Sequence, residues 1–210
     1  MLLRLASDPQ LFLIIALAFV IAITLHEASH AIVATWLGDD LPRIQGRVTL
    51  NPIRHLDPLG TVMIVIASFG WGRPVLVNPY QLRFGPRRGM ALVAAAGPAS
   101  NILLAVILTP IARELLSTGP ANTLSLIAVL VVQLNIFLAI FNLLPLPPLD
   151  GFNVLVGILP EESAARLDSI RKYGPGILMG LFLLIALIPE VVPNIIGGPA
   201  NWLLEVLLGL

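Results

Sequence analysis

LHEASHAIVATWL, at residues 25–37, is the most informative stretch of this sequence because it contains the motif H-E-x-x-H. On a helix, side chains four residues apart lie on one face, so His26 and His30 can bind one metal ion. Glu27 is then placed to act as a general base towards a water molecule at that metal. The stretch therefore predicts a helix that carries most of a catalytic metal site.

The residues before this motif place it in a membrane. LFLIIALAFVIAITL, at residues 11–25, has no charged side chain, and a helix that spans a bilayer needs about 20 apolar residues. Ionisable groups in hydrocarbon are costly, so three of them close together favour a functional site over a structural one. Of all 210 residues, 57% are apolar and 11% are charged, which is low for a soluble domain. We therefore expect an integral membrane protein.

The apolar segments predict an all-α, polytopic bundle of about four to six transmembrane helices, forming one domain over residues 1–210. Three core spans and two C-terminal spans are expected, at about 10–37, 89–112, 123–144, 175–188 and 195–210. The apolar segment 61–69 is too short to cross a bilayer, and glycine and proline follow it. A re-entrant segment near the metal site is predicted there.

The stretch RIQGRVTL, at residues 43–50, alternates apolar and polar side chains and includes β-branched residues. This alternation predicts a short β-strand between the first two core spans. The exposed edge of a strand can pair with an extended peptide, so substrate binding by edge pairing is a hypothesis for this stretch.

Charge and cysteine content narrow the class of protein. The net charge is zero, which gives no reason to expect nucleic acid, and the absence of cysteine excludes disulfides and cysteine-based zinc sites. If the motif end of the first span faces the cytoplasm, ten of the twelve Lys and Arg residues do so too, and Arg4 and Arg113 remain on the other side. The motif is therefore expected in the cytoplasmic half of the membrane.

A catalytic zinc site takes three protein ligands, so the two histidines need another. The candidates are the third histidine, His55, and the acidic residues of the apolar segments, among them Asp150 and Glu205. Asp150 follows the third core span, on the same expected membrane face as the motif, and would leave the fourth position to water. Otherwise Asp150 is a turn residue of the loop PPLDG. His55 is either a surface-loop residue or a residue of the cleft.

Four motifs together resemble the site-2 protease family of intramembrane zinc metalloproteases. The resemblance covers most of the chain between residues 21 and 153. The motifs are HEASH at 26–30, GRVTLNPIRHLDPLG at 46–60, AGPASN at 96–101 and FNLLPLPPLDG at 141–151. Small residues allow close helix approach, so Gly97 and Asn101 of the third motif are expected to serve helix packing near the site.

The resemblance implies a role for five residues. His26, His30 and Asp150 are implied as the ligands of one Zn²⁺, and Glu27 as the catalytic acid and base. Asn142 is implied to bind the scissile carbonyl or its oxyanion. Many members of the family add PDZ or CBS domains, for which no segment is long and polar enough, so a minimal core form is expected.

The resemblance also implies regulated intramembrane proteolysis in a bacterial or archaeal cell membrane. The expected substrate is a single-span membrane protein, such as an anti-sigma factor or a membrane-tethered regulator, and an oligomer is compatible with the sequence. Two other classes stay open: a transporter that relays ions through its intramembrane acids, and an inactive relative that only binds transmembrane helices. The sequence has no inverted repeat, which argues against the first, and retains Glu27, which argues against the second.

Overall fold

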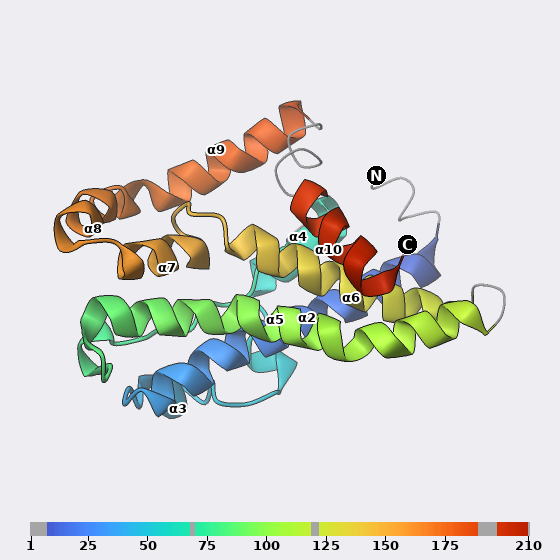
Figure 1. Ribbon diagram of the computed structural model, residues 1–210, viewed down its shortest axis with the longest axis horizontal. Coiled ribbons are helices and arrows are strands. Elements are labelled where there is room, and N and C mark those ends of the chain that lie inside the picture. Colours follow the sequence, from blue (N-terminus) through green and yellow to red (C-terminus); the bar gives the residue numbers. More distant parts are fainter. Residues whose placement is uncertain (1–7, 68–69, 119–121, 189–196, 210) are drawn as a thin grey trace.

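The computed structural model consists mainly of helices (Figure 1). It describes residues 8–67, 70–118, 122–188 and 197–209. Three of the described helices are long and apolar enough to cross a membrane: α2 (Pro9–Trp36), α5 (Gly85–Ser117) and α6 (Thr123–Asn142). These three helices overlap the three predicted core spans, and the all-helical class is confirmed for the described residues.

The C-terminal helices are shorter than predicted spans. Helices α9 (Gly174–Leu187) and α10 (Gly198–Leu208) have 14 and 11 residues. At about 1.5 Å per residue they extend roughly 21 and 17 Å, which is less than the ~30 Å of a hydrocarbon core. Residues 189–196 and 210, and the lead-in at 1–7, lie outside the described residues. The count of four to six spans therefore stays a prediction.

Helix α2 begins at a well-defined N-terminus and buries a stripe of small residues. The side chain of Asp8 accepts a hydrogen bond from the Leu11 amide, and Pro9 occupies the first turn, where its missing N–H is not needed. The buried face includes five alanines, whose small side chains let neighbouring backbones come close. These are Ala18, Ala22, Ala28, Ala31 and Ala34.

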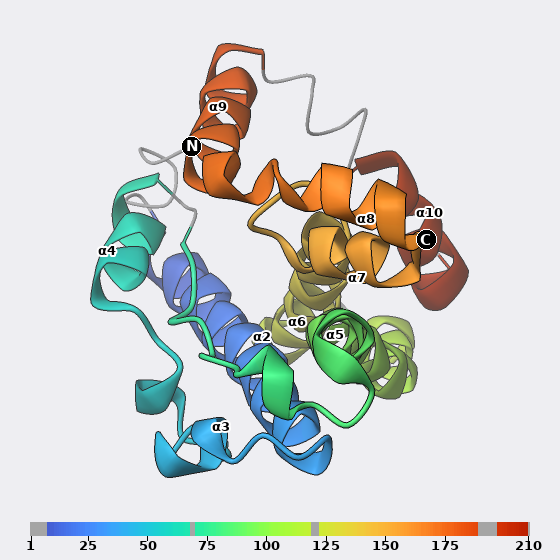
Figure 2. The ribbon, with the colours of Figure 1, turned by 90° about the vertical axis from the view of Figure 1, so that its left-hand side faces the viewer.

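Helix α5 is the central element of the bundle. It packs against α2, α6 and α7 (Asp150–Ile158), and the end-on view shows it beside α6 and beneath α7 (Figure 2). Gly97 and Asn101 lie on its buried face, as expected of residues that serve helix packing. This arrangement places α5 against both segments that contribute to the predicted metal site.

The β-strand predicted at 43–50 is wrong. The described residues contain no strand, and this stretch instead follows the short helix α3 (Leu41–Ile44) with turns. Pro42 starts the helix, and Gly46 follows it with a φ of 66°, a conformation that glycine adopts easily. A strand also needs a neighbour to share its hydrogen bonds, and none lies here. The edge-pairing hypothesis for this stretch fails with the strand.

Most of the predicted re-entrant segment lies in helix α4 (Pro58–Ala67), which has 10 residues. Residues 68 and 69 of the prediction lie outside the described part of the chain, so re-entry into the membrane stays a prediction. The chain then continues without helix from residue 70 to residue 78. We call residues 70–77 the wall segment, because several of them line the cavity described below.

A second layer of helices follows α6. Residues 143–149, which include three prolines, separate α6 from α7, which begins at Asp150. Helix α8 (Glu161–Asp168) packs on α7, α9 extends away from it, and α10 packs on α5 and α6 (Figure 1). Gly151 allows the turn into α7, because a Cβ atom there would lie 2.2 Å from the Leu143 carbonyl oxygen.

Candidate metal centre

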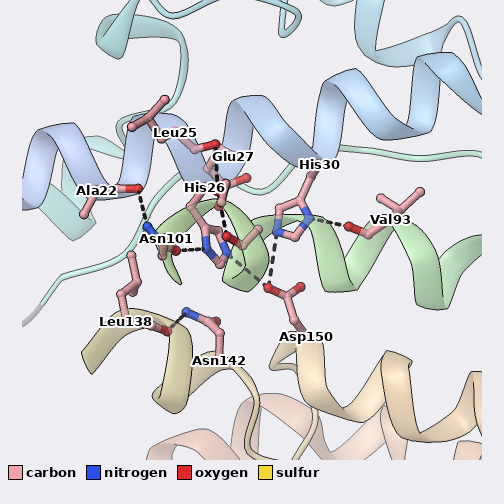
Figure 3. Close-up of polar contacts among 12 residues, drawn as sticks. Ala22, Leu25, His26, Glu27, His30, Val93, Asn101, Leu138, Asn142 and Asp150 are labelled. Atoms are coloured by element: carbon pink, nitrogen blue, oxygen red, sulfur yellow. Dashed lines mark hydrogen bonds and ion pairs between the residues drawn. The ribbon is translucent and has the colours of Figure 1, made fainter. Parts of the chain in front are cut away.

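His26 and His30 of α2 meet Asp150 at the start of α7 (Figure 3). The Oδ2 atom of Asp150 lies 3.0 Å from Nε2 of His26 and 3.2 Å from Nε2 of His30. Both histidines are buried, and Asp150 is partly buried at the first turn of α7. Among the described residues this is the cluster whose ligand atoms could hold a metal ion, all within 4.8 Å of one another.

The far side of each imidazole fixes its tautomer. Nδ1 of His30 lies 2.7 Å from the backbone carbonyl of Val93, which can only accept, so this nitrogen donates. Nδ1 of His26 lies 2.7 Å from Oδ1 of Asn101. The amide nitrogen of Asn101 donates to the Ala22 carbonyl, which assigns Oδ1 as the atom that faces His26. In its neutral form each histidine therefore carries its proton on Nδ1 and presents an unprotonated Nε2 to Asp150.

This arrangement fits a zinc ion. Two Nε2 lone pairs and a carboxylate oxygen face one another, and Oδ2 of Asp150 is buried with no hydrogen-bond partner in the described structure. Such atoms repel unless a cation lies between them. Zinc bonds of about 2.0 Å in a tetrahedral site separate ligand atoms by ~3.3 Å, close to both measured distances. Two imidazoles and one carboxylate also form a ligand set that zinc accepts readily.

Glu27 lies beside this cluster on α2 and is 8% exposed. It lines a cavity of about 470 Å³ together with His26, His30 and Asp150. The rest of the cavity surface is mainly apolar and comes largely from α2, α5, α6, α9 and the wall segment, including Phe19, Phe137, Leu178 and Phe182. The polar groups thus meet at one part of an apolar cavity, as is usual for small-molecule and peptide sites.

Asn142 lines the same cavity at the end of α6. Its amide nitrogen donates to the Leu138 carbonyl of its own helix at 2.9 Å (Figure 3). A primary amide has two N–H groups, so one remains available to a carbonyl in the cavity.

His55 and Glu205 are not part of the cluster. The His55 side chain is fully buried in the loop before α4, and its Nε2 donates to the Thr49 carbonyl at 2.7 Å. His55 is not among the residues that line the described cavity, and its side chain is buried inside the loop. Burial lowers the pKa of His55, which favours the neutral ring. Glu205 is exposed on α10.

Two features of the site were not assigned from the sequence. Asn101 holds His26 and also donates to Asn135 at 2.8 Å, so an amide chain from α6 supports the first histidine. Gly97 is required by the histidines, because a Cβ atom there would lie 2.5 Å from Nε2 of His30 and 2.6 Å from Cε1 of His26. Two asparagines in apolar spans were the available signal, since buried amides need partners.

Comparisons with known proteins give a consistent result. Peptidase family M50 matches residues 111–187, a region that includes Asp150. "Putative zinc metalloprotease YwhC" of Bacillus subtilis is 41% identical over 179 residues, or 80% of each chain. "Putative zinc metalloprotease Rip2" of Mycolicibacterium smegmatis is 32% identical over 184 residues, covering 86% of this chain and 71% of that protein. "Putative zinc metalloprotease MJ0611" of Methanocaldococcus jannaschii is 40% identical over 97 residues, covering 46% and 49%. No solved structure matches the chain significantly.

Proposed function

Because the chain belongs to peptidase family M50 and is a zinc metalloprotease, we propose that it cleaves single-span membrane proteins within or near their transmembrane segments. The observation that carries this proposal is the position of the His26, His30 and Asp150 cluster. Two of these residues lie on a helix long and apolar enough to span a membrane. A peptide bond that reaches them has to enter the same membrane.

In this proposal His26, His30 and Asp150 hold the zinc ion. A zinc ion held there would supply a Lewis acid able to lower the pKa of water and to polarise a carbonyl group. Glu27 takes a proton from the attacking water and returns it to the leaving amine. Asn101 and the Val93 carbonyl accept hydrogen bonds from Nδ1 of the two imidazoles, which fixes the ring orientation and leaves Nε2 for the metal.

Asn142 is proposed to bind the substrate carbonyl through its available N–H group. Such a donor contributes about 3 kcal/mol when it is aligned with the developing oxyanion. The apolar cavity surface suits the side chains of a transmembrane segment, provided that the segment unwinds to expose its backbone. Substrates of this kind are membrane-tethered regulators such as anti-sigma factors. The positive-inside bias supports an orientation with the site towards the cytoplasm, in a bacterial or archaeal membrane.

The test compares zinc content with cleavage of a single-span substrate in the purified, membrane-reconstituted protein. Glu27→Gln is expected to keep stoichiometric zinc and lose cleavage, whereas His26→Ala is expected to lose both. Glu205→Gln, an exposed acid on α10, is the matched control and is expected to behave as wild type. Wild-type protein without zinc, or cleavage that survives Glu27→Gln, would overturn the proposal.

A further inference from the structure

We propose that Arg47 is a positioning residue that holds the Glu27 carboxylate and the wall segment in one fixed arrangement. The inference rests on the proposed function, since it takes Glu27 as the general base. Arg47 lies in the stretch that alternation had predicted as a strand, and its side chain turns inward.

Arg47 is an unusual residue for a loop because its side chain is 5% exposed. Its guanidinium donates to the backbone carbonyls of Arg54 and Arg73, and its Nη2 atom lies 3.8 Å from Oε2 of Glu27. A buried guanidinium needs partners for its charge and its donors, and here they come from three separate segments. These are helix α2, the loop before α4, and the wall segment.

The contact with Arg73 connects Arg47 to the cavity. The wall-segment residues that line the cavity after Arg73 are Pro74, Val75 and Val77. The amide of Arg73 also donates to the His55 carbonyl at 2.7 Å, so the start of the wall segment is held twice. Arg47 therefore fastens the part of the cavity surface nearest to α2.

The wall segment in turn lies against Glu27. A Cβ atom on Gly72 would come within 3.2 Å of Oε1 of Glu27 and 2.8 Å of Cγ1 of Ile23, so this backbone is close to the carboxylate. One carboxylate oxygen thus faces Arg47 and the other faces Gly72. Together they restrict how the carboxylate turns, which matters because a general base acts only within hydrogen-bond reach of its proton.

Arg47 makes no contact with the three zinc ligands among the interactions of the described residues, which gives the inference a specific signature. Loss of Arg47 leaves the ligand set intact but frees Glu27 and the wall segment. Misplacement of a reacting group by about 1 Å can cost on the order of 100-fold in rate. We expect kcat to fall while zinc remains bound.

The experiment uses full-length, zinc-loaded protein in a reconstituted membrane. Arg47→Met is expected to lower kcat about 100-fold at stoichiometric zinc and to speed hydrogen exchange in residues 70–77. Arg47→Lys keeps a positive charge near Glu27, but a single ammonium group cannot also bind both the Arg54 and Arg73 carbonyls. Its kcat is therefore expected to lie between those of Arg47→Met and wild type, while hydrogen exchange in residues 70–77 stays fast. Arg43→Met is the matched control, because Arg43 is exposed and pairs with Asp40, and it is expected to change neither.

Wild-type kcat in Arg47→Met, or equal loss in both Arg47 variants without faster exchange, would overturn the inference. Loss of zinc in both variants would also overturn it, because Arg47 would then serve folding in general. Failure of the proposed function is distinguishable: Glu27→Gln would retain cleavage or wild type would lack zinc, while exchange in the wall segment would still respond to Arg47.

Discussion

Asn101 illustrates at the residue scale how a buried amide can control a metal ligand. Its two N–H donors are directed to Ala22 and Asn135, which leaves its oxygen for His26. The imidazole must then carry its proton on Nδ1, and Nε2 is free to bind metal. The sequence shows that an asparagine lies in an apolar span, but its partners come from two other helices, and only the fold identifies them.

Asn101→Ala is expected to weaken zinc binding by about 10- to 100-fold, because His26 loses the acceptor that fixes its tautomer and ring orientation. The measurement is a competition titration of the purified protein against a chelator of known affinity. Asn51→Ala serves as control, since Asn51 is exposed and its side chain accepts only from the Ile53 amide. Unchanged affinity in Asn101→Ala would assign Asn101 to helix packing alone.

Gly97→Ala is expected to disrupt the zinc site, because the added methyl group would overlap the rings of His26 and His30. Zinc stoichiometry and cleavage should both fall. Gly180→Ala is the matched control: it is also a helical glycine, but a Cβ atom there meets nothing within 4 Å. Alanine favours a helix over glycine by about 1 kcal/mol, so this control should be neutral or slightly stabilising. Full zinc occupancy in Gly97→Ala would contradict the expected overlap.

At the scale of elements, long apolar segments could be predicted and short ones could not. Helices α2, α5 and α6 follow from long stretches of high mean hydropathy with few charged residues, which leave a membrane chain few alternatives. The strand predicted for RIQGRVTL was wrong because the prediction relied on the alternation of apolar and polar side chains and not on the helix-boundary residues nearby. Pro42 and Gly46 mark the start and the end of a short helix, and the polar residue Arg47 points inward to satisfy three segments. Local pattern cannot reveal such a tertiary role.

His55 should make the loop between α3 and α4 sensitive to pH. Its pKa is lowered in the folded protein by burial and by nearby Arg47, whereas an exposed histidine titrates near pH 6.5. The opened loop therefore binds more protons than the folded loop once the pH falls below about 6.5, and the folded loop loses stability. Above that pH both forms are neutral and the contribution is constant.

The measurement is the rate of limited proteolysis within residues 48–57 at pH 7.5, 6.5 and 5.5. Wild type should become more susceptible as the pH falls, and His55→Gln, which keeps a donor for the Thr49 carbonyl but does not titrate, should change less. Parallel pH profiles for the two proteins would show that another group controls the loop.

At the scale of the whole molecule, the chain direction of the three long helices fixes which loops share a membrane face. The C-terminal end of α2 and the N-terminal end of α5 lie at one end of the bundle, and the C-terminal end of α5 and the N-terminal end of α6 lie at the other (Figure 1). This order was predictable from hydropathy, and the family resemblance implied that Asp150 joins His26 and His30. The packing of α7 on α5, which brings Asp150 to the histidines, could be identified only from the fold.

The chain has no cysteine, so single thiols can test this topology. Arg43→Cys and Ser117→Cys, both exposed, lie at opposite ends of the bundle. An impermeant thiol reagent applied from outside intact cells should label Ser117→Cys and not Arg43→Cys, with both labelled after permeabilisation. The reverse pattern would place the metal cluster in the outer half of the membrane.

The ligand set also joins distant parts of the chain, since His30 and Asp150 are about 120 residues apart in sequence. A bound ion therefore acts as a cross-link that closes a long loop, comparable in chain-entropy terms with a disulfide worth on the order of 4 to 5 kcal/mol. Removing zinc with a chelator is expected to lower the melting temperature by several degrees, and Asp150→Ala, but not Glu27→Gln, should abolish that response. The cell's supply of zinc would then determine how much folded protease persists as well as how much is active.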